Sequence, residues 1–110
     1  MSVKQGIEKE VNMETHFTFR NMEPSDSAKE HVLKKMKKFQ KYLIKPTRST
    51  VILSTDRFLK QCEIAVIDNG HEYVGVESNQ DMYVAIDKAV DKITTQLKKA
   101  KEKIKDHKKS

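Results

Sequence analysis

Lysine is the residue type in this chain best suited to bind a ligand, and it is concentrated in two short segments. Residues 28–45 hold seven lysines against one acidic residue, and residues 96–110 hold seven lysines against two. The other residues carry more acidic than basic groups, so the net charge of +6 understates the asymmetry. Because clustered like charge disfavours the compact state, the pattern indicates a polyanionic partner such as nucleic acid. A lysine-rich surface that is merely solvated is the alternative.

The scarcity of arginine indicates how a nucleic acid would be bound. The arginines are Arg20, Arg48 and Arg57, whereas direct readout of guanine usually relies on bidentate arginine. A lysine ammonium binds phosphate as a mobile point charge, and each neutralised phosphate releases condensed counterions. Lysines spaced three or four apart on a helix can therefore follow a ribose-phosphate backbone without reading bases. This composition favours shape-directed binding to folded RNA.

Catalytic and metal-binding chemistry is not indicated by the remaining polar residues. His16, His31, His71 and His107 lie far apart and none has the spacing of zinc ligands. Cys62 is the single cysteine, so it cannot form an internal disulfide, and we expect a small buried hydrophobe in a reducing compartment. The three glycines are isolated, which excludes a glycine-rich phosphate loop. We expect neither an enzyme nor a bound metal, cofactor or small-molecule substrate.

Hydrophobic periodicity predicts the elements that position the lysines. Residues 14–20 alternate Phe17 and Phe19 with polar side chains, which is the period of a half-buried strand. Residues 24–27 supply a proline and oxygen-bearing side chains that favour a helix start. An apolar stripe then recurs at steps of three or four, at Ala28, Val32, Met36, Phe39 and Leu43. We expect Pro46 to end this first helix.

Three further strands are predicted before the second helix. They are short and apolar or β-branched, and they cover residues 50–54, 61–67 and 72–77. A polar connection at residues 56–60 joins the first two. Asn69-Gly70 predicts a tight hairpin between the last two, because these residues tolerate positive φ. Alternation in the last strand places Tyr73 and Gly75 on one face and the intervening valines on the other.

A long helix is predicted over residues 79–109. Its apolar stripe consists of Met82, Ile86, Val90, Ile93, Leu97 and Ile104. The opposite side carries Lys88, Lys92, Lys99 and Lys103. Ser78 and Asp81 have the spacing of a capping box, so we expect the helix to begin there. Tyr83 lies near the stripe, and we expect it to pack in the core rather than to stack on a base.

These elements predict an α+β fold of order β-α-β-β-β-α. Four strands can form one mostly antiparallel sheet, and two helices with one apolar stripe each can cover one of its faces, which gives a two-layer sandwich. A helix of 27 residues is about 40 Å long, whereas a strand of seven residues spans about 24 Å. We therefore expect the C-terminal lysines to extend past the sheet, beside the lysines of the first helix. The two helices would then share one basic face.

The chain length of 110 residues is that of one domain. Residues 1–12 are polar and without periodicity, so we expect a flexible N-terminal extension followed by a domain at residues 13–110. We found neither a signal-like segment nor an apolar run of the roughly 18 residues that span a bilayer. A cytoplasmic protein without membrane contact is expected.

Residues 80–87, with the sequence QDMYVAID, resemble a motif of the ribosome hibernation-promoting factor and ribosome-associated inhibitor A family. The resemblance extends over roughly residues 13–107 and includes Lys92, Gln96-Leu97 and the KK-x-K-x-K-x-K tail. The family fold is β-α-β-β-β-α. The chain is similar to the short members, which lack the second domain that mediates ribosome dimerisation.

The resemblance implies a factor that binds the small ribosomal subunit and its rRNA and silences translation in stationary phase or stress. It implies a site at the decoding and mRNA channel, where family members block mRNA and the A- and P-site tRNAs. The basic positions of the family correspond to Lys29, Lys35, Lys38, Lys92, Lys99, Lys101 and Lys103. Thr95 stands where the family often has an arginine. The resemblance is compatible with two modes of action. The protein would either act together with a separate ribosome-dimerisation factor or hold ribosomes as single idle particles.

Two other functions are compatible with the residues. A double-stranded-RNA-binding module shares an α-β-β-β-α core, but it places basic residues at the start of the last helix, where this chain has Gln80 and Asp81. A protein-binding adaptor could dock its lysine-rich helix on an acidic partner. Tight binding to a free RNA duplex would favour the first, and a ribonuclease-insensitive pull-down would favour the second.

Overall fold

The computed structural model describes residues 13–109, with side chains described as far as Glu102. The predicted extension at residues 1–12 lies outside the described residues. The elements are β1 (Glu14–Arg20), α2 (Asp26–Gln40), β2 (Pro46–Asp56), β3 (Leu59–Asp68), β4 (His71–Asn79) and α3 (Met82–Lys109). The predicted order β-α-β-β-β-α is confirmed.

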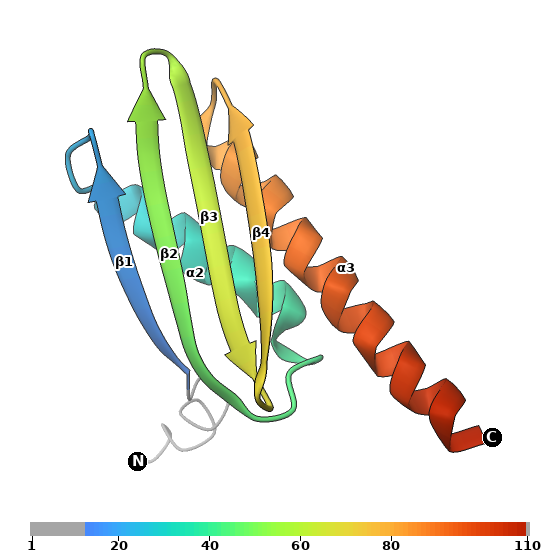
Figure 1. Ribbon diagram of the computed structural model, residues 1–110. Coiled ribbons are helices and arrows are strands. Elements are labelled where there is room, and N and C mark those ends of the chain that lie inside the picture. The colour runs from blue at the N-terminus through green and yellow to red at the C-terminus, as the bar shows by residue number, and fades with distance from the viewer. Residues whose placement is uncertain (1–12, 110) are drawn as a thin grey trace.

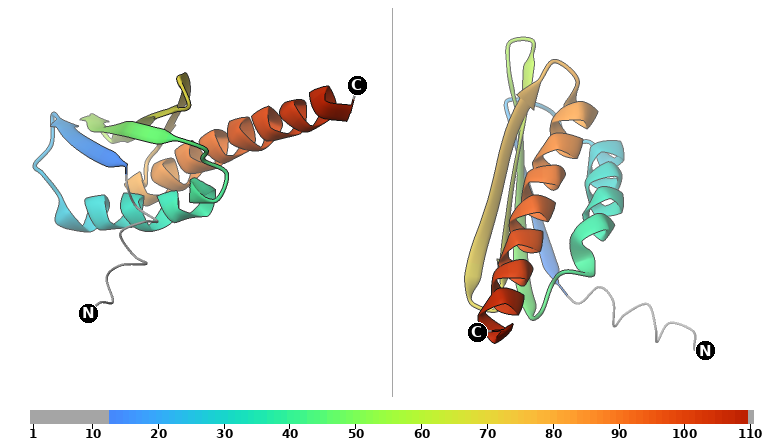
Figure 2. Two further views of the ribbon diagram at one scale, coloured as in Figure 1. Left: turned by 90° about the horizontal axis from the view of Figure 1, so that it is seen from below. Right: turned by 90° about the vertical axis from the view of Figure 1, so that its right-hand side faces the viewer.

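The strands form one sheet in the order β1-β2-β3-β4. β1 and β2 are parallel, whereas the other two pairs are antiparallel. A parallel pair needs a crossover connection, which α2 supplies. Both helices lie on the same side of the sheet (Figures 1 and 2). The predicted α+β two-layer sandwich is therefore confirmed, and α3 extends beyond the sheet as its length required.

The core lies between the sheet and the two helices. In β1, Phe17 and Phe19 face the helices beside Val51 and Leu53 of β2. The fully or almost fully buried side chains are Ala28, Val32, Met36, Phe39, Val51, Leu53, Cys62, Ile64, Val66, Ala85, Ile86, Ala89, Val90, Ile93 and Leu97. Burying each large aliphatic side chain contributes about 1.5–3 kcal/mol. Both predicted helix stripes supply core residues, which fixes the rotation of each helix about its axis. Within the described residues, neither helix is long and apolar enough to span a membrane.

The first helix ends earlier than predicted. The Ser25 side chain caps its start by accepting a hydrogen bond from the Ala28 amide at 3.1 Å. The helix stops at Gln40, and Pro46 begins β2 instead of ending the helix. The cause is tertiary, because the buried Asp68 carboxylate accepts hydrogen bonds from the Ile44 and Lys45 amides. These bonds hold the connection in a turn that a continued helix could not make.

The second helix starts later than predicted. Asp81 is its N-terminal cap, since its carboxylate accepts a hydrogen bond from the Tyr83 amide at 2.9 Å. The Ser78 hydroxyl instead donates to the Gln61 side chain at 3.4 Å. The predicted capping box is therefore wrong, and Asn79 belongs to β4 rather than to the helix.

Two short hairpins connect the last three strands. Asn69 and Gly70 have φ values of 54° and 82°, as a tight Asn-Gly turn requires. The other hairpin is tighter than the predicted polar connection, because Asp56 pairs with Leu59 and only two residues form the turn. One of them, Arg57, has a φ of 63°. This left-handed conformation is uncommon for a residue with a side chain as long as arginine.

Cys62 is fully buried, and its burial, with a smaller contribution from Glu63, raises the pKa of the thiol from 9.0 to about 12. We expect iodoacetamide to leave the folded protein unmodified at pH 9, because only the thiolate reacts. The protonated thiol contributes its stabilisation fully below pH 9, and that contribution is lost as the pH rises towards 12. Mass spectrometry of the protein after treatment with iodoacetamide, with and without denaturant, measures the extent of Cys62 labelling. Labelling of the folded protein as fast as of the unfolded chain would contradict the assignment.

Candidate nucleic-acid interface

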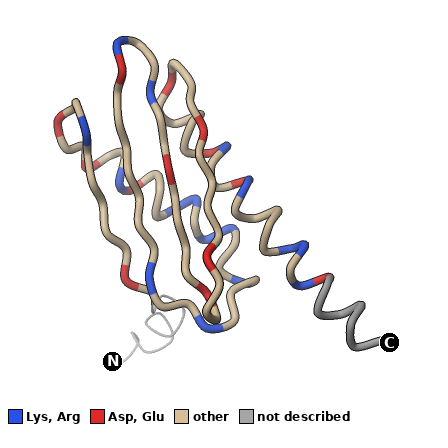
Figure 3. The backbone as a smooth tube through the Cα atoms, viewed as in Figure 1, with Lys and Arg blue, Asp and Glu red and all other residues tan. Residues whose placement is uncertain are grey.

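Both helices of the layer that covers the sheet carry lysines. α2 and α3 run side by side and contact each other directly (Figure 2). Lysine and arginine positions recur along both helices, whereas acidic positions are frequent in the strands and hairpins (Figure 3). The two helices lie side by side as the sequence predicted, but Asp87 and Asp91 of α3 lie among the lysines where the helices meet. Individual lysines have different partners.

Lys35 and Lys38 lie at the seam between the helices and pair with acidic residues of α3. The Lys38 ammonium is 3.0 Å from the Asp91 carboxylate, and the Lys35 ammonium is 3.8 Å from that of Asp87. His31 approaches the same Asp87 oxygen at 2.8 Å. Exposed ion pairs of this kind contribute about 0–1 kcal/mol. Their charges are partly neutralised within the protein, so they are weaker candidates for phosphate contacts than the sequence implied.

Lys92 closes the outer edge of the sheet. Its ammonium donates to the Val76 carbonyl at 3.0 Å and lies 2.8 Å from the Glu77 carboxylate. Gln96, one turn further along α3, donates to the Val74 carbonyl at 2.7 Å. These contacts occupy carbonyl groups on the edge strand that could otherwise recruit another strand. Lys92 therefore has a structural role at the sheet edge.

The remaining predicted lysines occupy different places on the helices. Lys29 lies near β1, with its ammonium 5.6 Å from the centre of the Phe17 ring. Lys99 and Lys101 are exposed on the second half of α3. Lys103 belongs to α3, but its side chain lies outside the described residues. Within the described part of the chain, no acidic group pairs with Lys29, Lys99 or Lys101. These three lysines can offer a full charge to an anion.

A cluster of lysines around one tyrosine was missed by the sequence analysis. The ammonium groups of Lys41, Lys98 and Lys101 lie 5.5, 5.9 and 6.0 Å from the centre of the Tyr42 ring. We call these four residues the Tyr42 cluster. Lys41 follows α2, whereas the other two lysines are on α3, so no sequence spacing indicates that they meet. None of the three lysines pairs with an acidic group among the described residues.

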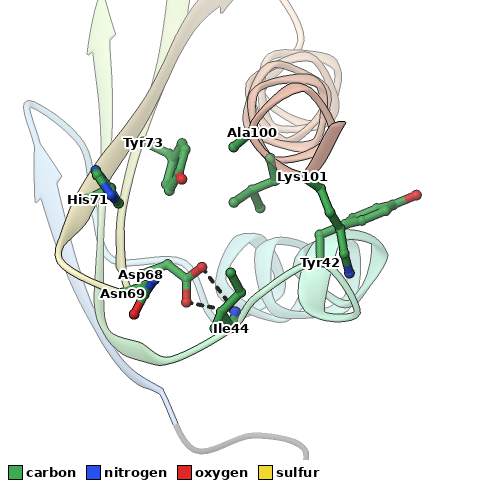
Figure 4. A pocket seen from close by; sticks show the side chains of 9 residues that line it. Tyr42, Ile44, Asp68, Asn69, His71, Tyr73, Ala100 and Lys101 are labelled. Atoms are coloured by element: carbon green, nitrogen blue, oxygen red, sulfur yellow. Dashed lines mark hydrogen bonds between the residues drawn. The ribbon is translucent and has the colours of Figure 1, made fainter. Parts of the chain in front are cut away.

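A pocket lies next to the Tyr42 cluster, between the β3–β4 hairpin, the connection after α2 and the middle of α3 (Figure 4). Its volume is about 280 Å³. The lining residues are Tyr42, Ile44, Asp68, Asn69, His71, Tyr73, Leu97, Ala100 and Lys101. Asp68 is 2% exposed and directs its carboxylate to the amides of the connecting loop. The wall is mostly apolar, and polar side chains of the hairpin stand at one side.

Tyr83 does not pack in the core as predicted. It is 41% exposed, and its hydroxyl lies 3.0 Å from that of Ser27. Its ring makes an edge-to-face contact with the His31 ring, with 4.8 Å between their centres. Tyr83 therefore joins the starts of the two helices at the surface. It helps to set their relative position.

The described residues contain no group of His, Cys, Asp or Glu side chains that could hold a metal ion. What the two helices offer is electrostatic. Lys41, just after α2, and Lys98 and Lys101 of α3 have no acidic partner in the part of the chain that the structure describes, and they lie next to an aromatic ring and a small pocket. Such a surface can bind the phosphates of a nucleic acid and carries little sequence information.

Comparison with known proteins places the sequence of this chain in one family. Residues 15–105 match the family described as sigma 54 modulation protein / S30EA ribosomal protein. The chain is 32% identical over 95 residues to the ribosome hibernation promoting factor of Escherichia coli strain K12, covering 86% of this chain and all of that protein. It is 31% identical over 91 residues to the ribosome hibernation promoting factor of Pseudomonas putida, covering 83% and 89% of the two chains.

Two solved structures share the fold. The N-terminal domain of Protein Y from Thermus thermophilus superposes with a TM-score of 0.70 at 32% identity, covering 76% of this chain and 93% of that domain. A ribosomal subunit interface protein from Coxiella burnetii gives a TM-score of 0.67 at 21% identity, covering 79% and 98%. At that lower identity the likeness concerns the fold alone.

Proposed function

This chain belongs to the ribosome hibernation promoting factor family, and we propose that it silences translation by binding the small ribosomal subunit. The family comprises ribosome-associated regulators of translation and not enzymes. The proposed site is the decoding and mRNA channel, where the protein would block mRNA and the A- and P-site tRNAs in stationary phase or stress. The proposed partner is the rRNA of that subunit, in the cytoplasm.

The observation that carries the proposal is a set of lysines on the second half of α3 and just after α2 that the described residues leave without an acidic partner. Lys41, Lys98, Lys99 and Lys101 have no acidic partner among the described residues. Holding these like charges together is unfavourable unless a polyanion neutralises them. Folded rRNA supplies closely spaced phosphates, and binding to them releases counterions. Family membership makes the ribosome the natural source of that RNA.

The geometry weakens the case for a general double-stranded-RNA-binding module. α3 begins after the acidic cap Asp81. Of its lysines without an acidic partner among the described residues, Lys88 lies in the first half, whereas Lys98, Lys99 and Lys101 lie in the second. The sheet also has β1 as a fourth strand, paired parallel to β2. The basic surface is therefore at the wrong end of the last helix for such a module. Tight binding to a free RNA duplex would reverse this preference.

Sedimentation with purified small subunits tests the proposal. We expect the protein to co-sediment with small subunits and to stop translation in a purified system. The affinity should fall about 1,000-fold between about 50 mM and 200 mM salt, because each of several phosphate contacts releases counterions and that release is less favourable at higher salt. Sucrose gradients of ribosomes from stationary-phase cells, with and without the protein, would separate ribosome pairs from inactive single ribosomes. Absence of co-sedimentation at low salt would refute the proposed function.

A further inference from the structure

The Tyr42 cluster brings three ammonium groups to one ring. The three ammonium groups lie within 6.0 Å of the ring centre, and they come from two helices. The ring face attracts cations, but each such contact contributes only about 0.5–1 kcal/mol at an exposed site. The lysines also repel one another, and no acidic residue pairs with them in the described part of the chain. A bound phosphate would balance these charges.

The neighbouring pocket gives a second, independent feature. Lys101 and Tyr42 belong both to the cluster and to the wall of the pocket, so the two sites adjoin. The Tyr73 ring faces the space between β4 and α3, whereas the Tyr42 ring points away from it towards the lysines (Figure 4). The volume of about 280 Å³ is just below the range of about 300–1,000 Å³ typical of drug-sized ligands. It therefore suits a single flat ring system. Tyr73 and Leu97 form the apolar side of the wall.

Polar groups stand where the edge of such a ring would lie. Asn69 and His71 are exposed on the β3–β4 hairpin and line the pocket from the side opposite α3. An amide and an imidazole can each donate and accept hydrogen bonds. Asp68, the acidic residue of the wall, is occupied by the loop amides at 2.7–3.1 Å. The wall thus combines an apolar floor with a few hydrogen-bonding groups.

We propose that the Tyr42 cluster and the pocket together bind one unstacked nucleotide of single-stranded RNA. The phosphate lies among Lys41, Lys98 and Lys101, and the base enters the pocket against Tyr73. This inference rests on the proposed function, because it assigns a contact with RNA to a defined place on the same two helices. It also goes beyond that function, since a surface that only follows phosphates would be indifferent to the base. An apolar pocket beside the phosphate site gives the base its own binding energy.

Two single-stranded RNA hexamers with equal numbers of phosphates test the assignment. One carries six adenines, and the other has the same backbone without bases. We expect the wild-type protein to bind the adenine hexamer about tenfold more tightly, because stacking of a base on an aromatic ring contributes on that scale. Fluorescence anisotropy of labelled hexamers at low salt measures both affinities. Equal affinity for the two hexamers would overturn the proposal.

Matched variants locate the site. Tyr73→Leu should abolish the preference for bases, whereas Tyr73→Phe should keep it. Ile44→Glu, at a wall position that is 57% exposed, should abolish it as well by placing a carboxylate at the pocket. Lys98→Gln should weaken binding of both hexamers, whereas Lys60→Gln, at the start of β3 and the opposite end of the sheet, should leave both unchanged. A base preference that survives both Tyr73→Leu and Ile44→Glu would place the base elsewhere and refute the assignment.

The same variants separate this inference from the proposed function. If the wild-type protein sediments with small subunits but shows no base preference, the nucleotide site is wrong and the proposed function stands. If it does not sediment with subunits, the proposed function fails, and the hexamer comparison still decides whether the pocket binds a base. Circular dichroism of each variant confirms that the comparison is made on folded protein.

Discussion

Reversing the charge of Lys99 and Lys101 together is expected to weaken binding to the small ribosomal subunit about 100-fold at near-physiological salt. Both side chains are exposed on the second half of α3, and neither has an acidic partner among the described residues. Each glutamate replaces an attraction to phosphate with a repulsion. Inhibition of translation should fall in parallel, and titration with subunits in an ultracentrifuge measures the affinity.

The control for this double variant is the reversal of Arg48 and Lys60, which lie on β2 and β3 rather than on the helices. It changes the net charge by the same amount, so it separates local contacts from the overall field of the protein. We expect less than about a threefold loss for the control. Neutral variants add a second measure, because each glutamine that replaces a phosphate-binding lysine should lower the salt slope by about 1. Equal losses for both reversals would contradict a site on the helices.

Replacing Gly75 with alanine is expected to destabilise the fold by about 3 kcal/mol, near the upper range for an overpacked core. An added Cβ at Gly75 would lie 2.6 Å from the Ala89 carbonyl oxygen and 3.2 Å from the Lys92 Cβ. The first contact is with the backbone of α3, so relief requires the helix to move away from β4. Thermal unfolding should show a fall in Tm of roughly 15 °C for a domain of this size.

Gly70→Ala is the matched control, because it makes the same chemical change at an open position. Nothing lies within 4 Å of a Cβ placed there, and the cost comes from the φ of 82° alone. We expect this variant to lose about 1 kcal/mol. The Gly75 variant should in addition bind subunits more weakly than its residual stability explains, since displacement of α3 moves its lysines relative to α2. A loss no larger at Gly75 than at Gly70 would show that α3 can adapt at little cost.

The order of elements and the core were predictable because their signals are local. Alternation at Phe17 and Phe19 marks β1 in any context, and Asn69-Gly70 marks its hairpin through the φ values that it tolerates. The boundaries of the helices were not predictable in the same way. The Asp68 carboxylate holds the connection after α2 by accepting hydrogen bonds from the Ile44 and Lys45 amides. These partners are more than twenty residues apart in the sequence.

The candidate site also has some features that were predictable from the sequence and others that depend on tertiary contacts. By itself, the sequence determined that two lysine-rich helices would lie on one face of a sheet, because hydrophobic period and charge segregation are properties of the chain. Only the tertiary structure decided which lysines keep a full charge. It pairs Lys38 with Asp91, sets Lys92 on the edge of β4 and brings Lys41, Lys98 and Lys101 to Tyr42. The physical reason is that a carboxylate neutralises an ammonium group only within a few ångströms, and the carboxylates that do so here belong to other elements of the fold.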